Sequence, residues 1–156
     1  MKASQDFYPE EFAHCYGCGP ANAQGLHLKS YVDGNETVAR FKPAENYSGG
    51  YPGHVYGGMI ASLLDCHGTA SAAAFAHRER GLEMGQGEEP IRFVTASLRI
   101  EYKRPTPLGM ELVIRGSLSS LDGRKAIVAL SLSADDELCA SAEMLAIEYR
   151  RQTWAP

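Results

Sequence analysis

The fold is decided by residues 56–80, which read YGGMIASLLDCHGTASAAAFAHRER. Bulky apolar side chains such as Met59, Ile60 and Leu63 recur at three- and four-residue spacing, and this period predicts one long helix over the stretch. The remaining positions are unusually rich in alanine, glycine and serine. Small side chains let a helix approach the surrounding backbone closely, as a helix embedded in a curved sheet must.

Period-two alternation and turn signals predict strands on both sides of this helix. The expected strands are 26–32 and 37–41 before it, and 94–102, 110–120, 125–133 and 138–150 after it. The order of two strands, a long helix and four strands joined by hairpins indicates an α+β domain with an antiparallel sheet of five or six strands. One helix cannot cover both faces of that sheet. The simplest arrangement is a sheet wrapped around the central helix, with its outer face or edge used for self-association.

Length and composition predict one domain over residues 1–156, with residues 1–13 as a lead-in and 151–156 as a tail. The chain is 44% apolar and 22% charged, which excludes a wholly disordered protein. Its net charge of -4 gives no electrostatic reason to bind nucleic acid. The sequence contains neither an apolar stretch of membrane-spanning length nor an export signal. A cytoplasmic protein with reduced thiols is therefore expected.

Three segments in this order and spacing resemble hotdog-fold thioesterases. They are HCYGCGPANAQGLHL at 14–28, GHVYGGMIASLLD at 53–65 and VTASLRIEYKRPTPLG at 94–109. The sequence is most similar to the phenylacetate-pathway (PaaI-like) and THEM4-like branches, and the likeness covers residues 14–149. It implies a hotdog fold, dimers or dimers of dimers, and hydrolysis of an acyl-CoA or related thioester. It also implies no cofactor beyond the coenzyme A of the substrate.

Asp65 is the first candidate for catalysis. It follows an apolar run on a helix expected to be largely buried, and a buried carboxylate costs free energy unless it is paired. A solvent-facing helix aspartate is the plainer interpretation. The resemblance implies that this residue is the nucleophile or the general base, and the sequence does not decide between these roles.

Gly57 and Gly58 begin the expected helix. The plainer interpretation is a tight turn before a helix. Backbone N–H groups at a helix start lack partners within the helix and lie at the positive end of its dipole, so they suit the developing charge of a thioester carbonyl. Glycine also lets a substrate approach closely. The resemblance implies that the Gly57 N–H is the donor.

The spacing of Gly57 and Asp65 predicts where the site lies. On one helix they are about 12 Å apart along the axis and point about 80° apart. One helix therefore cannot bring both to the same carbonyl. If both act on one substrate, they come from different subunits, which predicts two sites at a two-fold dimer interface.

Thr69 and Thr95 are further candidates. Thr69 lies one turn after Asp65, where the 4-hydroxybenzoyl-CoA branch carries a threonine beside the acid, but a helix hydroxyl commonly bonds the carbonyl one turn back. The resemblance implies that Thr95 orients the water, whereas alternation alone places it on an exposed strand face.

The sequence departs from the family pattern next to the glycine pair. Tyr56 stands where many members have histidine, and Gly50 stands where many have asparagine or glutamine. His54 is a candidate to replace the missing contact with the thioester carbonyl. Lys103 and Arg104 are candidates for the phosphates of CoA, with a solvated strand end as the alternative.

Cys15 and Cys18 raise a zinc hypothesis, with His14 and His27 beside them. A structural zinc site normally has four well-spaced protein ligands, and no second Cys-x2-Cys pair exists. The other two cysteines, Cys66 and Cys139, fall in predicted regular elements. No metal site is expected on these grounds. A nucleophilic pair of Cys66 with His67 is also disfavoured, because adjacent helix residues diverge by about 100°.

Two other functions remain open at this point. The first is a non-catalytic module that binds acyl-CoA or an acyl carrier, which the departures at Tyr56 and Gly50 favour. The second is a dehydratase or hydratase, which needs a histidine together with an acid, and the helix offers only His67 beside Asp65.

Overall fold

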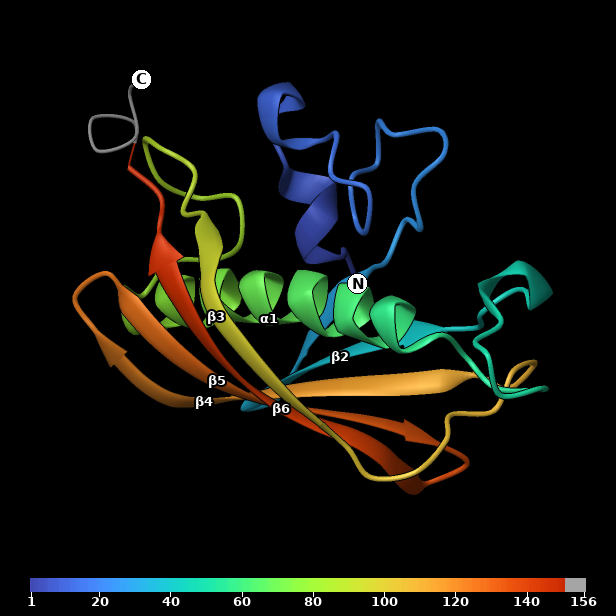
Figure 1. The fold of residues 1–156 in the computed structure, drawn as a ribbon. Coiled ribbons are helices and arrows are strands. Elements are labelled where there is room, and N and C mark those ends of the chain that lie inside the picture. Colours follow the sequence, from blue (N-terminus) through green and yellow to red (C-terminus); the bar gives the residue numbers. More distant parts are fainter. Residues whose placement is uncertain (151–156) are drawn as a thin grey trace.

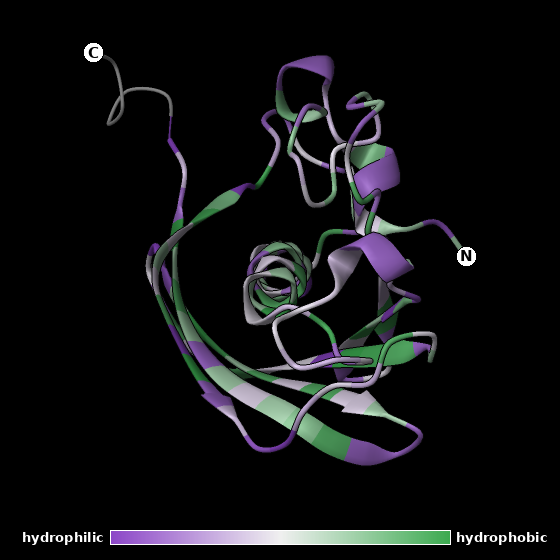
Figure 2. Ribbon diagram, turned by 45° about the vertical axis from the view of Figure 1, so that its right-hand side comes forward, coloured by the Kyte–Doolittle hydropathy of each residue, from purple (hydrophilic) through white to green (hydrophobic). Residues whose placement is uncertain are grey.

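A six-stranded antiparallel sheet curls around one long helix in the computed structural model, which describes residues 1–150 (Figures 1 and 2). The elements are α1 (Gly57–Glu79), β1 (Ser30–Asp33), β2 (Glu36–Phe41), β3 (Phe93–Tyr102), β4 (Leu112–Asp122), β5 (Lys125–Ala134) and β6 (Glu137–Glu148), with short 3-10 helices η1 (Ser4–Phe7), η2 (Glu10–Phe12) and η3 (Glu45–Tyr47). The expected sheet wrapped around a central helix is confirmed, with six strands. The expected tail, 151–156, lies outside the described residues.

The strand order is β1-β2-β4-β5-β6-β3, which differs from a run of hairpins. Hairpins join β4 to β5 and β5 to β6, as expected. The expectation that a hairpin also joins β3 to β4 is wrong, because β3 pairs with β6 at the sheet edge. Two prolines, Pro105 and Pro107, follow β3, and the chain leaves the sheet there.

The first strand begins at Ser30, four residues later than expected. The backbone N–H of Leu26 donates to the carbonyl of Tyr16, and that of Leu28 donates to the carbonyl of Gly17. His27 between them has a φ of 54°, in the left-handed region. The alternating leucines of this segment are buried by a loop that folds back on itself, so their period two does not mark a strand.

Helix α1 is buried around most of its circumference, which explains its dense run of small residues. Leu63 and Leu64 are fully buried. At Gly68, a side-chain carbon would lie 2.6 Å from Cε of Met144 on β6. The sheet therefore approaches the helix too closely for any larger residue without repacking, as the composition of the stretch predicted.

A buried polar network fixes α1 against β1 and β2. The ring of His67 lies 2.9 Å (Nδ1) from the hydroxyl of Ser30 and 3.2 Å (Nε2) from that of Thr37. Thr37 also bonds Ser71 at 2.6 Å between the two hydroxyl oxygens. Burial lowers the pKa of His67 to about 4, so the ring is neutral near pH 7.

The N-terminal segment lies on the side of α1 that the sheet leaves open (Figure 2). Its first 3-10 helix, η1, buries Ser4 and Gln5. Gln5 Oε1 accepts the backbone N–H of Ser30 at 2.8 Å, so the segment is tied to the first strand. Among the described residues, no helix has the length and apolarity to cross a membrane.

Candidate functional site

Asp65 lies near the middle of α1 and faces the edge strand β3. The hydroxyl of Thr95 donates to Oδ1 of Asp65 at 2.5 Å. Asp65 is half-buried, less than the apolar run before it suggested, because its side of the helix meets an edge strand. The pair offers a carboxylate with one oxygen engaged by a neutral donor and with access from solvent.

Thr95 reaches Asp65 because β3 carries a bulge. Thr95 pairs with Ala146 and Ser97 pairs with Leu145, so Ala96 is an extra residue on β3. The extra residue reverses the alternation that follows it. Thr95 is exposed, as alternation suggested, but the bulge turns its side chain toward α1 and away from the face of Ser97.

The amino end of α1 forms a second polar feature. The carbonyl of Tyr56 accepts the N–H groups of Met59 and Ile60, so Gly57 and Gly58 begin the first turn, and their own N–H groups have no partner within the helix. The hydroxyl of Tyr102 donates to the Gly57 carbonyl at 2.9 Å.

Tyr102 marks the end of β3 beside this helix start. A side-chain carbon at Gly57 would lie 3.6 Å from the Tyr102 ring, so the phenol borders the glycine backbone. Burial raises the pKa of Tyr102, and the nearby phenol of Tyr56 adds to the rise. Sequence reasoning missed Tyr102, because alternation presents it only as the last apolar residue of a strand.

The two features stand at opposite ends of the same strand. Thr95 contacts Asp65 near one end of β3, and Tyr102 contacts Gly57 at the other. Along α1, Gly57 and Asp65 are about 12 Å apart, as expected from their spacing. Within one chain, therefore, the helix-start N–H groups and the carboxylate do not meet.

Two of the other candidates are bonded to local backbone. Thr69 donates to the carbonyls of Asp65 at 3.3 Å and Cys66 at 3.2 Å, which is the ordinary role of a helix hydroxyl. Nδ1 of His54 lies 2.9 Å from the Pro52 carbonyl, and its ring stacks on Tyr51.

The two basic candidates both have acidic partners. Lys103 pairs with Glu101, and Arg104 pairs with Glu137. Arg104 and His54 also line one cavity of about 260 Å³. The acidic partners offset part of the positive charge that an anionic ligand would meet.

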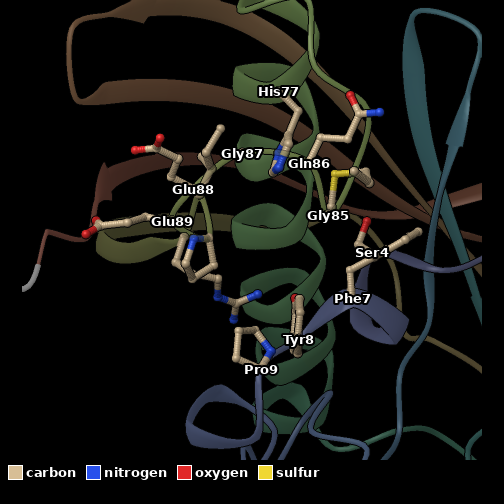
Figure 3. A pocket seen from close by; sticks show the side chains of 14 residues that line it. Ser4, Phe7, Tyr8, Pro9, His77, Gly85, Gln86, Gly87, Glu88 and Glu89 are labelled. Atoms are coloured by element: carbon tan, nitrogen blue, oxygen red, sulfur yellow. The ribbon is translucent and has the colours of Figure 1, made fainter.

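Cavities gather at the carboxyl end of α1. A cavity of about 170 Å³ lies between η1, His77 and the 85–92 segment (Figure 3), and one of about 820 Å³ adjoins Phe75 and Leu82. Their walls include helix residues and residues of the 81–90 loop. His77, which borders both, is about 18 Å along the axis from Asp65.

Three of the four cysteines come together on another side of α1. The sulfurs of Cys15, Cys18 and Cys66 lie within 4.8 Å of one another, and those of Cys15 and Cys66 are 3.7 Å apart. Hydrogen bonds from Cys18 and Cys66 lower the pKa of Cys15, while the bond with Cys15 raises the pKa of Cys18 to about 11.

This cluster corrects one step of the sequence reasoning. Cys66 does lie in a regular element, yet the loop that carries Cys15 and Cys18 folds onto it. His67 points elsewhere, to Ser30 and Thr37, so it pairs with neither Cys66 nor Asp65. That placement removes the structural basis for a nucleophilic Cys66–His67 pair and for a dehydratase pair of His67 with Asp65.

Comparison with known proteins places these features in a family. The model of the family described as "Thioesterase superfamily" matches residues 52–141, more than half of the chain. The acyl-coenzyme A thioesterase THEM4 of Rattus norvegicus is 36% identical over 88 residues, which are 56% of this chain and 32% of that protein. The chain thus spans about a third of the length of this curated relative.

Solved structures agree in fold. A thioesterase superfamily protein from Shewanella loihica is 40% identical, with a TM-score of 0.68, over 92% of this chain and 100% of that one. The PaaI protein of E. coli, from the phenylacetic acid degradation operon, has a TM-score of 0.64 over 80% of this chain and 81% of that one. It is only 14% identical, so this second likeness concerns the fold alone.

Proposed function

Because the chain belongs to the thioesterase superfamily, we propose that it hydrolyses acyl-CoA or related acyl thioesters to a free acid and a thiol. The observation that carries the proposal is the bond of Thr95 to Asp65, which orients a solvent-accessible carboxylate on the central helix. Asp65 serves as the general base, and the helix-start N–H of Gly57 stabilises the oxyanion.

The edge strand β3 supports a site shared between two subunits. It is ten residues long, and within residues 1–150 it pairs with β6 alone; Val94 and Tyr102 near its ends are 37% and 53% exposed. A long edge with apolar side chains is a template for pairing with a second strand. Antiparallel pairing of two β3 strands across a two-fold axis would extend the sheet and form a homodimer.

That pairing would also complete the site. An antiparallel partner sets Tyr102 of the second subunit opposite the Thr95 end of the first. Since Tyr102 borders Gly57, and Thr95 bonds Asp65, the Gly57 N–H of one subunit would approach the Asp65 carboxylate of the other. Each dimer would then hold two equivalent sites. Pairing of dimers into tetramers would leave this arrangement unchanged.

The reaction follows from these positions. Oδ1 of Asp65 is held by Thr95, and Oδ2 takes a proton from the water that attacks the thioester carbon. The carbonyl oxygen gains negative charge and accepts the N–H of Gly57 from the partner subunit. Collapse of the intermediate breaks the carbon–sulfur bond, and the thiolate of CoA leaves and takes up the proton held by Asp65, which restores the carboxylate. Water is the only co-reactant.

The remaining candidates lie next to Gly57 or Tyr102 in the sequence. Tyr56 and Gly58 adjoin Gly57 at the helix start, and His54 precedes them, so we assign these three to contacts with the thioester group. Lys103 and Arg104 follow Tyr102 and are assigned to the phosphates of CoA. We propose no cofactor, and Thr69 supports the helix turn that carries Asp65.

Thiol release from a panel of short, medium, long and aromatic acyl-CoAs tests the proposal. The wild type is expected to turn over at least one of them, and Asp65→Asn to lose activity by a factor of about a hundred or more, with unchanged circular dichroism. Absence of turnover on every thioester, together with tight CoA binding, would instead identify a non-catalytic acyl-CoA-binding module.

A further inference from the structure

We propose that Cys15, Cys18 and Cys66 bind one zinc ion, with a water molecule as the fourth ligand. The three sulfurs lie within 4.8 Å of one another, and Sγ of Cys15 is 3.7 Å from Sγ of Cys66. Two thiolates bound to tetrahedral zinc at about 2.3 Å are about 3.8 Å apart. The sulfurs therefore stand close to the spacing that a zinc ion needs.

The loop 15–19 is shaped to bring its sulfurs to the helix. A side-chain carbon at Gly17 would lie 2.2 Å from Sγ of Cys66, so only glycine permits this approach. At Gly19, such a carbon would lie 2.3 Å from the backbone nitrogen of Cys15 and 2.4 Å from the Ala13 carbonyl oxygen. Both glycines thus permit a tight turn, and this turn brings the sulfurs of Cys15 and Cys18 close to that of Cys66.

A cation lies near the three sulfurs. Arg92 stacks over the Tyr8 ring with its guanidinium carbon 3.5 Å from the ring centre, and its charge acts on Cys18. Three thiolates around Zn²⁺ carry one net negative charge, which this cation would partly balance.

The donor set selects the kind of ion. Three sulfurs with no oxygen or nitrogen ligand from the described residues 1–150 suit thiophilic ions such as Zn²⁺ and exclude Mg²⁺ and Ca²⁺. Each thiol gives its proton to solvent when the ion binds, so three protons leave for each Zn²⁺. Cys15 is exposed, which gives the ion a route from solvent and leaves room for the bound water.

The ion would link the N-terminal segment, which carries Cys15 and Cys18, to Cys66 on α1. Cys66 follows Asp65 directly on the helix, so the two side chains diverge by about 100°. The Asp65 side meets β3, whereas the Cys66 side meets the loop that carries Cys15 and Cys18. The zinc site therefore lies beside the candidate catalytic site and is independent of the proposed reaction. Metal bound across segments distant in sequence stabilises the fold.

Titration of the reduced full chain with Co²⁺ and Zn²⁺ tests the proposal. One equivalent of Co²⁺ is expected to give a sulfur-to-cobalt charge-transfer band and the intense visible bands of a tetrahedral site. Zn²⁺ is expected to abolish both and to raise the melting temperature. Cys15 is exposed, so Cys15→Ser is expected to leave the fold intact. This variant is expected to weaken Zn²⁺ binding more than tenfold, since loss of a group that only hydrogen-bonds a metal ligand already lowers metal affinity at least about tenfold. Cys18→Ser and Cys66→Ser are expected to do the same.

Cys139→Ser is the matched control, because Cys139 is a buried cysteine on β6 outside the cluster. It is expected to bind both ions as the wild type does. Absence of the charge-transfer band, equal Zn²⁺ affinity in Cys15→Ser, or a native disulfide that joins two of the three thiols would each overturn the proposal.

Discussion

Thr95 Oγ1 donates a 2.5 Å hydrogen bond to Oδ1 of Asp65 across the gap between the edge strand and the central helix. The bond exists because Ala96 is an extra residue that turns Thr95 toward the helix. Tyr102, seven residues later, faces the helix too and bonds the Gly57 carbonyl. In a regular strand without a bulge, Thr95 and Tyr102 would lie on opposite faces of the sheet.

Thr95→Val removes the donor to Asp65 while it keeps the shape of the side chain. The kcat for thioester hydrolysis is expected to fall roughly 10- to 100-fold, because a hydrogen bond to a charged group contributes about 1.5–3 kcal/mol. KM is expected to change little. Steady-state kinetics check this, and Thr95→Ser, which keeps the hydroxyl, is expected to retain most of the activity. Equal kcat in wild type and Thr95→Val would show that the bond has no part in the reaction.

A single turnover in ¹⁸O-labelled water distinguishes the role of Asp65 as base from a role as nucleophile. With Asp65 as base, water attacks the thioester directly, so the label is expected in the released acid alone. Mass spectrometry of the acid and of the peptide that contains Asp65 measures both products. Label in the Asp65 peptide would indicate an acyl-enzyme anhydride and would contradict the assigned role.

Replacement of Lys103 and Arg104 by alanine tests the assignment of the CoA phosphates. KM for an acyl-CoA is expected to rise by a factor of roughly 1.4 to 5 per charge, since exposed ion pairs contribute about 0.2–1 kcal/mol. The same acyl group on N-acetylcysteamine, which has no phosphate, serves as the control substrate and is expected to show no change. An equal rise for both substrates would mean that these residues do not recognise phosphate.

His67 makes the stability of the fold depend on pH. Its pKa is lowered by burial from 6.5 to about 4, so below pH 6.5 the unfolded chain takes up a proton that the folded chain does not. The free energy of unfolding is therefore expected to fall as pH drops from 6.5 to 4, by roughly 3 kcal/mol in all. Urea denaturation of chelator-treated protein at several pH values measures it.

His67→Gln is the control for this pH dependence, because glutamine cannot titrate. It is expected to be less stable at pH 7 and to show a shallower decline toward pH 4, since the carboxylates still titrate in both proteins. Identical slopes in wild type and His67→Gln would show that the buried ring does not contribute.

Much of the fold was predictable because it follows local periodicity. The expected helix, 56–80, differs from α1 by one residue at each end, and the hairpins at Asp122-Gly123 and Asp135-Asp136 lie between the strands expected at 110–120, 125–133 and 138–150. The place of β3 in the sheet was not predictable in this way. Which strand pairs with which depends on contacts distant in sequence. β3 pairs with β6, although β4 and β5 lie between them in the sequence.

The candidate site was predictable only for residues whose sequence positions match those of functional residues in the family. Asp65 and Gly57 were identified from the helix and from the resemblance, and their separation follows from helix geometry alone. The inward turn of Thr95 depends on the bulge at Ala96, which alternation does not reveal. The approach of Cys15 to Cys66 depends on tertiary contacts made possible by Gly17, and no local pattern indicates these.

The shared site is tested by two variants that each remove one half of it. Gly57→Pro deletes the N–H at the first helical position, where proline is well tolerated. Tyr56 has φ -59° and ψ 131°, as a residue before proline requires. Gly57→Ala keeps the N–H and is the matched control, expected to stay active. Asp65→Asn removes the base, and each of the two inactivating variants alone is expected to lose nearly all activity.

The most direct measurement is the activity of a purified mixed dimer of Gly57→Pro and Asp65→Asn subunits. If each site combines Asp65 of one subunit with Gly57 of the other, one of the two sites in the mixed dimer is intact. The expected activity is about half of the wild-type kcat per dimer, since the two sites of a symmetric dimer are equivalent. A mixed dimer as inactive as its parents, or a fully active monomer, would contradict the shared site.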